Sequence, residues 1–287
     1  MINDLTLIGG VSGSGKSVAL TALEDSGYYT VSHLPLPLIL PTARLLTATG
    51  ERALAITLNS KMLSDTSELD TTLASLKEEG WNARLLFLDA KNDTLVKRFS
   101  ETRRRHPFSD TKHVLVEAIE KERLLVDGLR ARSFVIDTSD LSASALRGWI
   151  KDFAHIDASR LLLMFESFGY KHGVPFDADL VFDARCLPNP YYETGLAVLT
   201  GRDNAVVEFL EASSEVERMR RDICDFVSRW LPEYERDNRN YLTVAIGCTG
   251  GRHRSVYLAE QLAAVFQSKY QVIVRHRVLT PPISKSD

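Results

Sequence analysis

The sequence predicts an α/β protein with two domains, the first built on a mostly parallel sheet. Short apolar runs alternate with segments of helical periodicity, an order that favours a parallel sheet covered by helices. The first apolar run ends in a glycine-rich motif that opens a helix. The chain has 287 residues, more than a single hydrophobic core usually holds. The elements are therefore expected in two sets, one for each domain.

The composition is that of an ordinary globular protein. Hydrophobic residues make up 44% and charged residues 25% of the chain, which excludes collagen-like, low-complexity and wholly disordered classes. The net charge of −3 means that nucleic-acid binding would need a local basic patch. Cys186, Cys224 and Cys248 are too few and too scattered for a disulfide framework or a zinc site. The sequence has no signal-peptide pattern and no membrane-spanning apolar run, so we expect a cytoplasmic protein without a membrane partner.

In the first domain, we expect strands at short buried apolar runs and helices where apolar residues recur every three or four positions. The expected strands are 5–8, 28–31, 53–58, 85–88 and 134–136, and the expected helices are 16–25, 69–79, 95–105, 113–130 and 143–153. This domain is placed at residues 1–153.

The pattern starts again near residue 160 and predicts a second α/β domain at residues 160–279. Its expected strands are 161–165, 180–183, 241–246 and 271–275, and its expected helices are 206–230 and 255–266. Residues 280–287 are predicted to be a flexible tail.

The glycine-rich motif matches G-x-x-x-x-G-K-[ST] in full and stands between a strand and a helix, the context of a P-loop. Its residues are Gly10, Val11, Ser12, Gly13, Ser14, Gly15, Lys16 and Ser17. Lys16 is expected to contact the β- and γ-phosphates as a catalytic residue, and Ser17 to hold Mg²⁺. The motif predicts a P-loop NTPase domain that binds ATP or GTP with Mg²⁺, and nothing in the sequence fixes the base.

Two further features are predicted to serve the nucleotide. Asp89 ends an apolar strand, where a P-loop protein places a carboxylate for metal binding and catalysis, although a helix N-cap would explain it equally well. Arg103 and Arg104 end a helix before Pro107, so they are expected to close over the phosphates. The alternative for each arginine is a solvated helix end that complements the helix dipole.

A second anion-binding loop is predicted near the C-terminus, again between a strand and a helix. Its residues are Cys248, Thr249, Gly250, Gly251, Arg252, His253, Arg254 and Ser255. A phosphate or sugar-phosphate site without chemistry is the preferred interpretation. The C-x-x-G-x-x-R-S spacing is also typical of cysteine-dependent phosphatases, but Gly247 stands where those enzymes have a histidine. A structural turn with an inert Cys248 is the third possibility.

The last seventy residues are locally basic. From Arg218 onward there are twelve Lys and Arg against seven Asp and Glu. Arg236, Arg239, Arg275 and Arg277 stand among aromatic residues, a mixture that favours contacts to an RNA backbone. The alternative is a set of helix-end charges with solvated partners.

Several segments together resemble the RapZ/YvcJ family of bacterial nucleotide-binding proteins. They are GVSGSGKSVALTALEDSGYYTV, LLFLDA, TRRRHP, MFESFGYKHGVPFDADLVFDARCLPNP and YLTVAIGCTGGRHRSV, and they cover the chain from the P-loop to about Arg277. The resemblance implies a P-loop NTPase kinase-like N-terminal domain with ATP and GTP binding and weak hydrolysis. It also implies an amino-sugar-phosphate pocket at the loop from Gly247 to Ser255, where glucosamine-6-phosphate is the expected ligand.

The resemblance further implies a homo-oligomeric adapter that presents a small regulatory RNA to ribonuclease E and so controls amino-sugar synthesis. A small-molecule kinase is the alternative function. Three departures from the family pattern matter: Ser32-His33 replaces an Asp-Asn pair, the nucleotide element reads Asn59-Ser60-Lys61-Met62, and the basic C-terminal cluster is missing. The first two argue for slow hydrolysis, and the third argues for weaker RNA binding.

Overall fold

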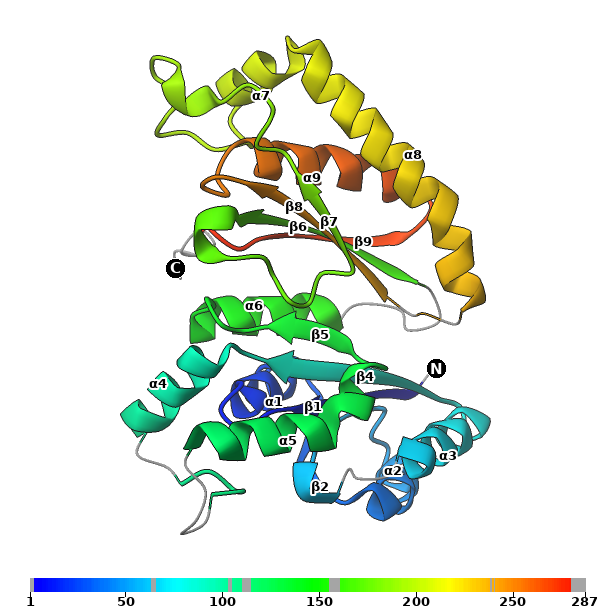
Figure 1. Ribbon diagram of the computed structural model, residues 1–287. Coiled ribbons are helices and arrows are strands. Elements are labelled where there is room, and N and C mark those ends of the chain that lie inside the picture. The colour runs from blue at the N-terminus through cyan, green and yellow to red at the C-terminus, as the bar shows by residue number, and fades with distance from the viewer. Residues whose placement is uncertain are drawn as a thin grey trace, which may run out of the picture. The chain divides into compact units, whose positions relative to one another are not determined.

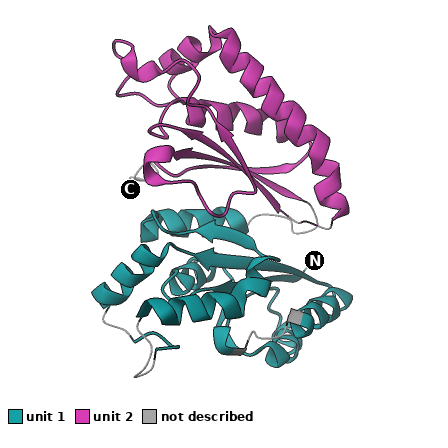
Figure 2. Ribbon diagram, in the orientation of Figure 1, with its two compact units in different colours: residues 1–158 teal, residues 159–287 magenta. Residues whose placement is uncertain are grey.

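The computed structural model describes residues 3–62, 66–102, 105–109, 115–154, 161–237, 239 and 241–279. The chain divides into two compact units, residues 1–158 and residues 159–287, which are coloured separately in Figure 2. We call them unit 1 and unit 2. The predicted tail, residues 280–287, lies outside the described residues.

Unit 1 contains a five-stranded sheet with the order β2-β3-β1-β4-β5, all parallel. The strands are β1 (Asn3–Gly10), β2 (Tyr29–Leu34), β3 (Ala53–Leu58), β4 (Trp81–Asp89) and β5 (Phe134–Asp137). The helices beside them in Figure 1 are α1 (Lys16–Glu24), α2 (Ile39–Ala48), α3 (Thr66–Glu78), α4 (Asn92–Thr102), α5 (Leu115–Arg130) and α6 (Ala143–Ala154). Short 3₁₀ turns occur at η1 (Leu36–Leu38) and η2 (Ser60–Met62).

The core of unit 1 explains why the sheet is parallel. Both faces of β1 are buried, and Leu5, Leu7, Ile56 and Phe87 are fully inaccessible to solvent. Helices on both sides of a parallel sheet require such continuous apolar runs. The register places Gly10 beside Leu88, so the chain leaves β1 next to the end of β4.

Unit 2 contains a four-stranded parallel sheet with the order β7-β8-β6-β9. Its strands are β6 (Leu162–Gly169), β7 (Leu180–Asp183), β8 (Tyr241–Cys248) and β9 (Gln271–His276). Its helices are α7 (Asn204–Glu211), α8 (Ser214–Arg236) and α9 (Arg254–Phe266), with 3₁₀ turns at η3 (Tyr170–His172) and η4 (Pro190–Tyr192). Helix α9 packs on the sheet, and α8 packs on α9.

The α/β fold class with a second α/β unit is confirmed, and every predicted strand is present. One predicted helix needs correction, and one helix was not predicted. The helix expected over 206–230 is two helices, because the Ser213 side chain accepts a hydrogen bond from the Val216 amide at 3.3 Å and caps a new helix there. The apolar pattern does not predict α2, whose first turn contains Pro41. Proline is tolerated at that position, since a first-turn amide has no partner within the helix.

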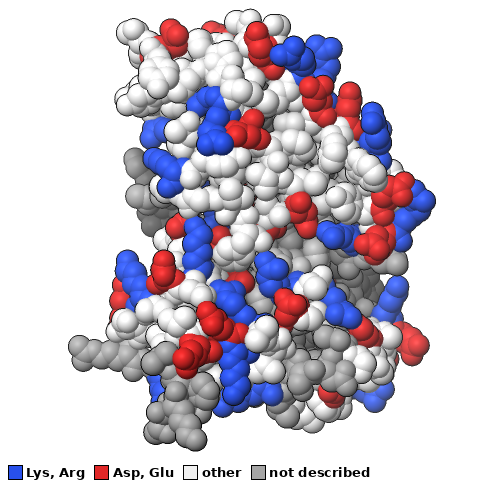
Figure 3. Space-filling model, viewed as in Figure 1, with Lys and Arg blue, Asp and Glu red and all other residues white. Residues whose placement is uncertain are grey.

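The surface carries mixed charge. In the view of Figure 3, Lys and Arg side chains are interspersed with Asp and Glu over both units. No helix in the described part of the chain is long and apolar enough to cross a membrane.

Candidate functional site: two anion-binding loops

The predicted P-loop connects β1 to α1, and its glycines are required by geometry. A Cβ atom on Gly10 would lie 2.2 Å from the Leu88 carbonyl oxygen. Gly13 and Gly15 have φ angles of 85° and 107°, a region that favours glycine. These residues bring the backbone close to β4 and turn it into the helix N-terminus, where the helix dipole favours a phosphate.

Lys16 is held against the loop itself. Its Nζ donates to the carbonyl oxygens of Gly10 at 2.6 Å and Val11 at 3.0 Å. Burial lowers the pKa of Lys16, and the nearby Glu122 carboxylate opposes that change. Ser17, the predicted magnesium ligand, is the second residue of α1 and is exposed.

A buried carboxylate that the sequence analysis missed is hydrogen-bonded to the P-loop. Glu122 of α5 is fully buried, and it accepts hydrogen bonds from the Ser12 amide at 2.7 Å and the Ser12 hydroxyl at 2.9 Å. The Ser60 hydroxyl donates to the same carboxylate at 2.7 Å, and Nε2 of His106 lies 3.2 Å from it. Burial alone would raise the pKa of Glu122, but His106, Lys16 and the hydrogen bonds from Ser12 and Ser60 lower it to about 2.

The predicted element 59–62 follows β3, beside the P-loop strand. Ser60 reaches the P-loop indirectly, because Glu122 accepts from both Ser60 and Ser12. Asn59 accepts from the Lys61 amide at 3.1 Å, which shapes the 3₁₀ turn that ends at Met62. Of this element, Ser60 has the clearest link to the P-loop.

Asp89 lies at the predicted place but has other partners. Arg123 donates to both of its carboxylate oxygens, at 2.5 and 2.7 Å, and the Ala90 amide donates at 2.8 Å. Nε of Arg130 is 3.6 Å away. This buried carboxylate therefore pairs with α5 and caps its own turn, an arrangement that does not favour the predicted metal-binding and catalytic roles. Among the described residues, no group of three His, Cys, Asp or Glu side chains could hold a metal ion.

Arg98 of α4 is the arginine that the described part of the chain brings to the P-loop. It donates to the Gly13 carbonyl at 3.1 Å and to the Thr138 carbonyl at 2.7 Å. Burial lowers its pKa, and Asp137 opposes this. Arg103 and Arg104, the arginines predicted to close over the nucleotide, lie outside the described residues.

The second predicted loop connects β8 to α9 in unit 2. It begins at Gly247, where a Cβ atom would lie 2.4 Å from the Phe168 ring and 2.5 Å from the Tyr170 ring. The histidine of a cysteine-dependent phosphatase has no room at this position. The Lys171 amide donates to the Thr249 carbonyl at 3.3 Å. The backbone of Lys171 and His172 therefore lies next to the loop, and both residues are exposed. The sequence analysis did not assign these two residues, although the KHG segment in the family resemblance contains them.

Cys248 is a buried part of this loop. Its Sγ accepts from the Gly251 amide and lies near the Ser255 hydroxyl, both at 3.2 Å. Burial raises the pKa of Cys248, but the hydrogen bonds from Ser255 and Gly251 and the charge of Arg254 outweigh it and lower the pKa below its ordinary value. A thiol pKa lowered in this way does not by itself distinguish a nucleophile from a structural cysteine.

The arginines of the second loop bind protein carbonyls. Buried Arg254 donates to the carbonyls of Arg185 and Leu187 at 2.8 and 3.0 Å. Exposed Arg252 donates to the Leu199 carbonyl at 2.9 Å. Buried His253 has a lowered pKa, chiefly because of burial. Both guanidinium groups thus fasten the segment between β7 and α7 to the loop.

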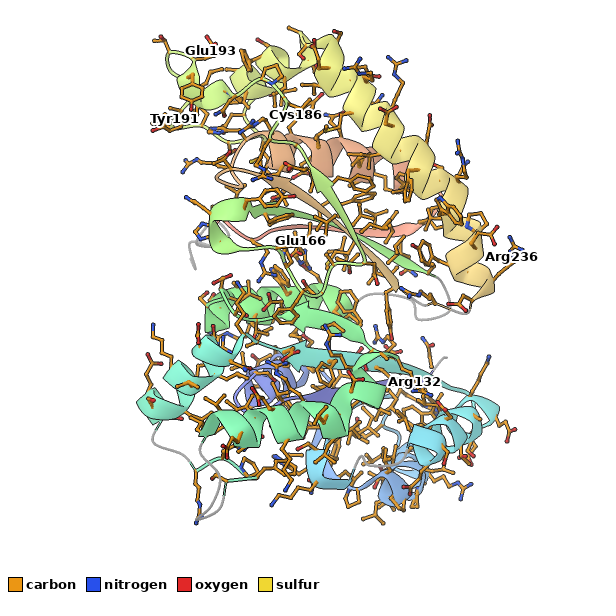
Figure 4. All side chains as sticks on the ribbon, in the orientation of Figure 1. Arg132, Glu166, Cys186, Tyr191, Glu193 and Arg236 are labelled. Carbon is orange, nitrogen blue, oxygen red and sulfur yellow. The ribbon has the colours of Figure 1, made fainter. Side chains whose placement is uncertain are left out.

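The four predicted RNA-binding arginines do not form one patch. Exposed Arg236 pairs with Glu233, and Arg239 pairs with Asp179 at 2.9 Å. Both precede β8, whose eight residues separate them from the loop after β8 by about 25 Å of strand. Figure 4 shows Arg236 at the end of α8, on the opposite side of unit 2 from Tyr191.

The other two arginines belong to the end of the sheet where the second loop lies. Arg275 is half-buried in β9 and donates to the carbonyl of Val274 at 2.9 Å. Arg277 has a side chain only 7% exposed, and its Nη1 lies 3.2 Å from an Oε atom of Glu166. Glu166 is labelled inside the sheet of unit 2 in Figure 4. Arg277 is therefore an internal partner of the fold.

Sequence comparisons decide the family. Residues 3–157 match the RapZ-like N-terminal domain, and residues 161–280 match the RapZ C-terminal domain. The chain belongs to the RapZ-like family. A protein of Thiobacillus denitrificans named "Nucleotide-binding protein" is 54% identical over 276 residues, which cover 96% of this chain and 99% of that protein. An Azoarcus relative, also named a nucleotide-binding protein, is 53% identical over 95% of this chain and 94% of its own length.

Solved structures with some likeness to this RapZ-like chain include two kinases of small molecules. A gluconokinase from Sinorhizobium meliloti has a TM-score of 0.35 and 19% identity, with coverage of 55% of this chain and 95% of its own. A shikimate kinase from Acinetobacter baumannii has a TM-score of 0.37 and 15% identity, with coverage of 53% and 93%.

Proposed function

We propose that this protein is a nucleotide-binding, RNA-binding adapter that senses glucosamine-6-phosphate and directs ribonuclease E to a small regulatory RNA. In this account, unit 1 binds ATP or GTP with Mg²⁺ and hydrolyses it weakly. The protein acts in the cytoplasm as a homo-oligomer. The observation that carries the proposal is a glycine-rich turn between a buried strand and a helix start in each unit, in a chain whose relatives are named nucleotide-binding proteins.

The P-loop residues fit a nucleotide. The glycine backbone and the start of α1 provide amides and a dipole for the phosphates, and Lys16 lies at the loop to offset their charge. The Ser17 hydroxyl is exposed at the same helix end, and Mg²⁺ bound with phosphates needs few protein ligands. Asp89 pairs with Arg123 and Glu122 with Ser12, so neither carboxylate is placed to activate water. Slow hydrolysis follows.

The second loop fits an amino-sugar phosphate, which carries an anion and a cation. The start of α9 and the exposed Lys171 would bind the phosphate group of such a ligand. Asp183 ends β7 in register with Gly247, and its hydrogen bonds from Arg185 lower its pKa, which keeps the carboxylate charged. A charged carboxylate beside a phosphate loop suits an ammonium group on the sugar.

A paired assay separates the adapter from the alternative, a small-molecule kinase. A kinase needs a base for its acceptor hydroxyl. The adapter predicts RNA binding that weakens steeply with salt through counterion release. It also predicts ATP turnover well below the roughly 1–100 s⁻¹ of kinases. RNA that fails to bind at low salt, together with ATP consumption in proportion to an added sugar or nucleoside, would establish the kinase instead.

Glucosamine-6-phosphate titrated against a preformed RNA complex tests the sensor. Sensing requires the two ligands to change each other's affinity reciprocally. Because Arg236 and Arg239 precede β8 while the loop follows it, coupling through one shared surface would involve Arg275 rather than those two. Arg275→Ala should weaken both the RNA affinity and its response to the sugar phosphate. An RNA affinity that does not change at saturating sugar phosphate would remove the sensor.

A further inference from the structure

Glu122 joins four segments that are far apart in the sequence. Ser12 belongs to the P-loop, Ser60 follows β3, His106 follows α4, and Glu122 itself comes from the middle of α5. Its side chain is 0% exposed. A carboxylate is moved into a protein interior at a high free-energy cost unless hydrogen bonds and opposite charges offset it. The three donor hydrogen bonds, His106 and Lys16 supply that compensation here.

The contact with the Ser12 amide fixes the P-loop backbone. Glu122 accepts this amide on one oxygen and the hydroxyl of the same serine on the other, so Ser12 is held by two bonds in one orientation. The next residue, Gly13, has a φ of 85°, and its carbonyl accepts from Arg98 at 3.1 Å. The chain is thus fixed on both sides of the turn that presents the loop to a phosphate.

We propose that Glu122 is a positioning residue for the nucleotide, one that preorganises the P-loop by holding Ser12 and tying it to Ser60 and His106. This role rests on the proposed nucleotide site. A loop already in its binding conformation loses less conformational freedom when the phosphates arrive, so its affinity is higher. Glu122 acts through the loop and does not itself contact the ligand.

The test compares Glu122→Gln with Glu120→Gln. Gln keeps the shape of the side chain but removes its charge and replaces one acceptor oxygen with a donor, so it can no longer accept from the Ser12 amide on one side and from the Ser12 and Ser60 hydroxyls on the other. Glu120 is exposed on the same helix, so its substitution removes one charge without touching the loop. Binding of ATP with Mg²⁺ is measured by calorimetry, and exchange of the Ser12 amide hydrogen is measured by NMR.

Glu122→Gln should weaken ATP binding at least tenfold, which corresponds to about 1.4 kcal/mol. It should also accelerate exchange at Ser12 more than at core amides such as that of Leu7, which a general loss of stability would not do. Glu120→Gln should change neither quantity. Unchanged ATP affinity in folded Glu122→Gln, or unchanged protection at Ser12, would overturn the positioning role.

A second variant covers the case in which Glu122→Gln does not fold. Ser60→Ala removes one donor at a half-buried position and should weaken ATP binding about two- to fivefold with the fold intact; an unchanged affinity would again overturn the role. A wild-type protein that binds neither ATP nor GTP would overturn the proposed function as well. Wild-type binding equal to that of the variants would overturn the positioning role alone.

Discussion

The two glycine-rich loops have the same local plan and different chemistry. Each connects a buried parallel strand to a helix, at β1–α1 in unit 1 and β8–α9 in unit 2. In the first loop, Lys16 donates to a loop carbonyl, and Glu122 accepts a hydrogen bond from the Ser12 amide. In the second, Arg254 binds carbonyls of a neighbouring segment and Cys248 accepts a loop amide. A glycine-rich turn before a helix therefore predicts an anion site, but the surrounding side chains decide how it is used.

The largest expected effect comes from the closest backbone approach in the P-loop. Gly10→Ala would place a methyl group 2.2 Å from the Leu88 carbonyl oxygen at a φ of 141°. The combined strain and overpacking should lower the free energy of unfolding by about 3–4 kcal/mol. The control is Gly148→Ala in α6, where an added Cβ has nothing within 4 Å; it should be neutral or stabilising. Equal denaturant midpoints for the two variants would show that the loop has no such close packing.

The contrast between the loops also shows what the sequence could and could not predict. Strand–glycine–helix order is local, so the positions of both loops and of every strand followed from apolar runs and turn residues. The partners of Asp89 were not predictable, because Arg123 lies 34 residues away and no local pattern pairs them.

Glu122 did leave a signal in the sequence. It is spaced three and four residues from Ile119, Ala118 and Val126, all buried in α5, so it falls on the apolar face of its helix. A carboxylate on a buried face requires partners. The identity of those partners, Ser12 and Ser60, depends on how α5 packs, which the periodicity does not specify.

Acid should weaken unit 1 through Glu122. Its pKa is lowered from 4.5 to about 2 in the folded protein, so its stabilising contribution is present above pH 4.5 and is lost as the pH falls toward 2. The full contribution is about 3 kcal/mol. In urea unfolding, the stability difference between wild type and Glu122→Gln should narrow across this interval. A difference that stays constant from pH 5 to pH 2.5 would refute the linkage.

In unit 2, Arg254→Ala tests the fastening of the second loop. The change removes hydrogen bonds to the carbonyls of Arg185 and Leu187, and unpaired buried carbonyls cost free energy. We expect a loss of about 2 kcal/mol in unfolding free energy together with weaker glucosamine-6-phosphate binding. Arg252→Ala, at an exposed position, should have the smaller effect on stability. The reverse order of the two stabilities would contradict this interpretation of the contacts.

The smallest effect is expected at Cys248. Cys248→Ser keeps a small polar side chain near Gly251 and Ser255, so sugar-phosphate binding should change less than about threefold, below 1 kcal/mol. The wild type should not hydrolyse a generic aryl phosphate, since Phe168 and Tyr170 fill the space of the missing histidine. Hydrolysis that disappears in Cys248→Ser would make this loop a phosphatase site and remove the contrast with the P-loop.

Binding of a labelled ATP analogue to the wild type and to Lys16→Ala tests the central claim most directly. Lys16 contacts the carbonyls of Gly10 and Val11 at the loop, and its charge is the one that the P-loop brings to the phosphates. The account predicts saturable binding to the wild type, dependent on Mg²⁺, and no measurable binding to Lys16→Ala, while urea unfolding shows that the variant is folded. Equal affinity of the two proteins for the analogue would contradict it, because the nucleotide would then bind elsewhere.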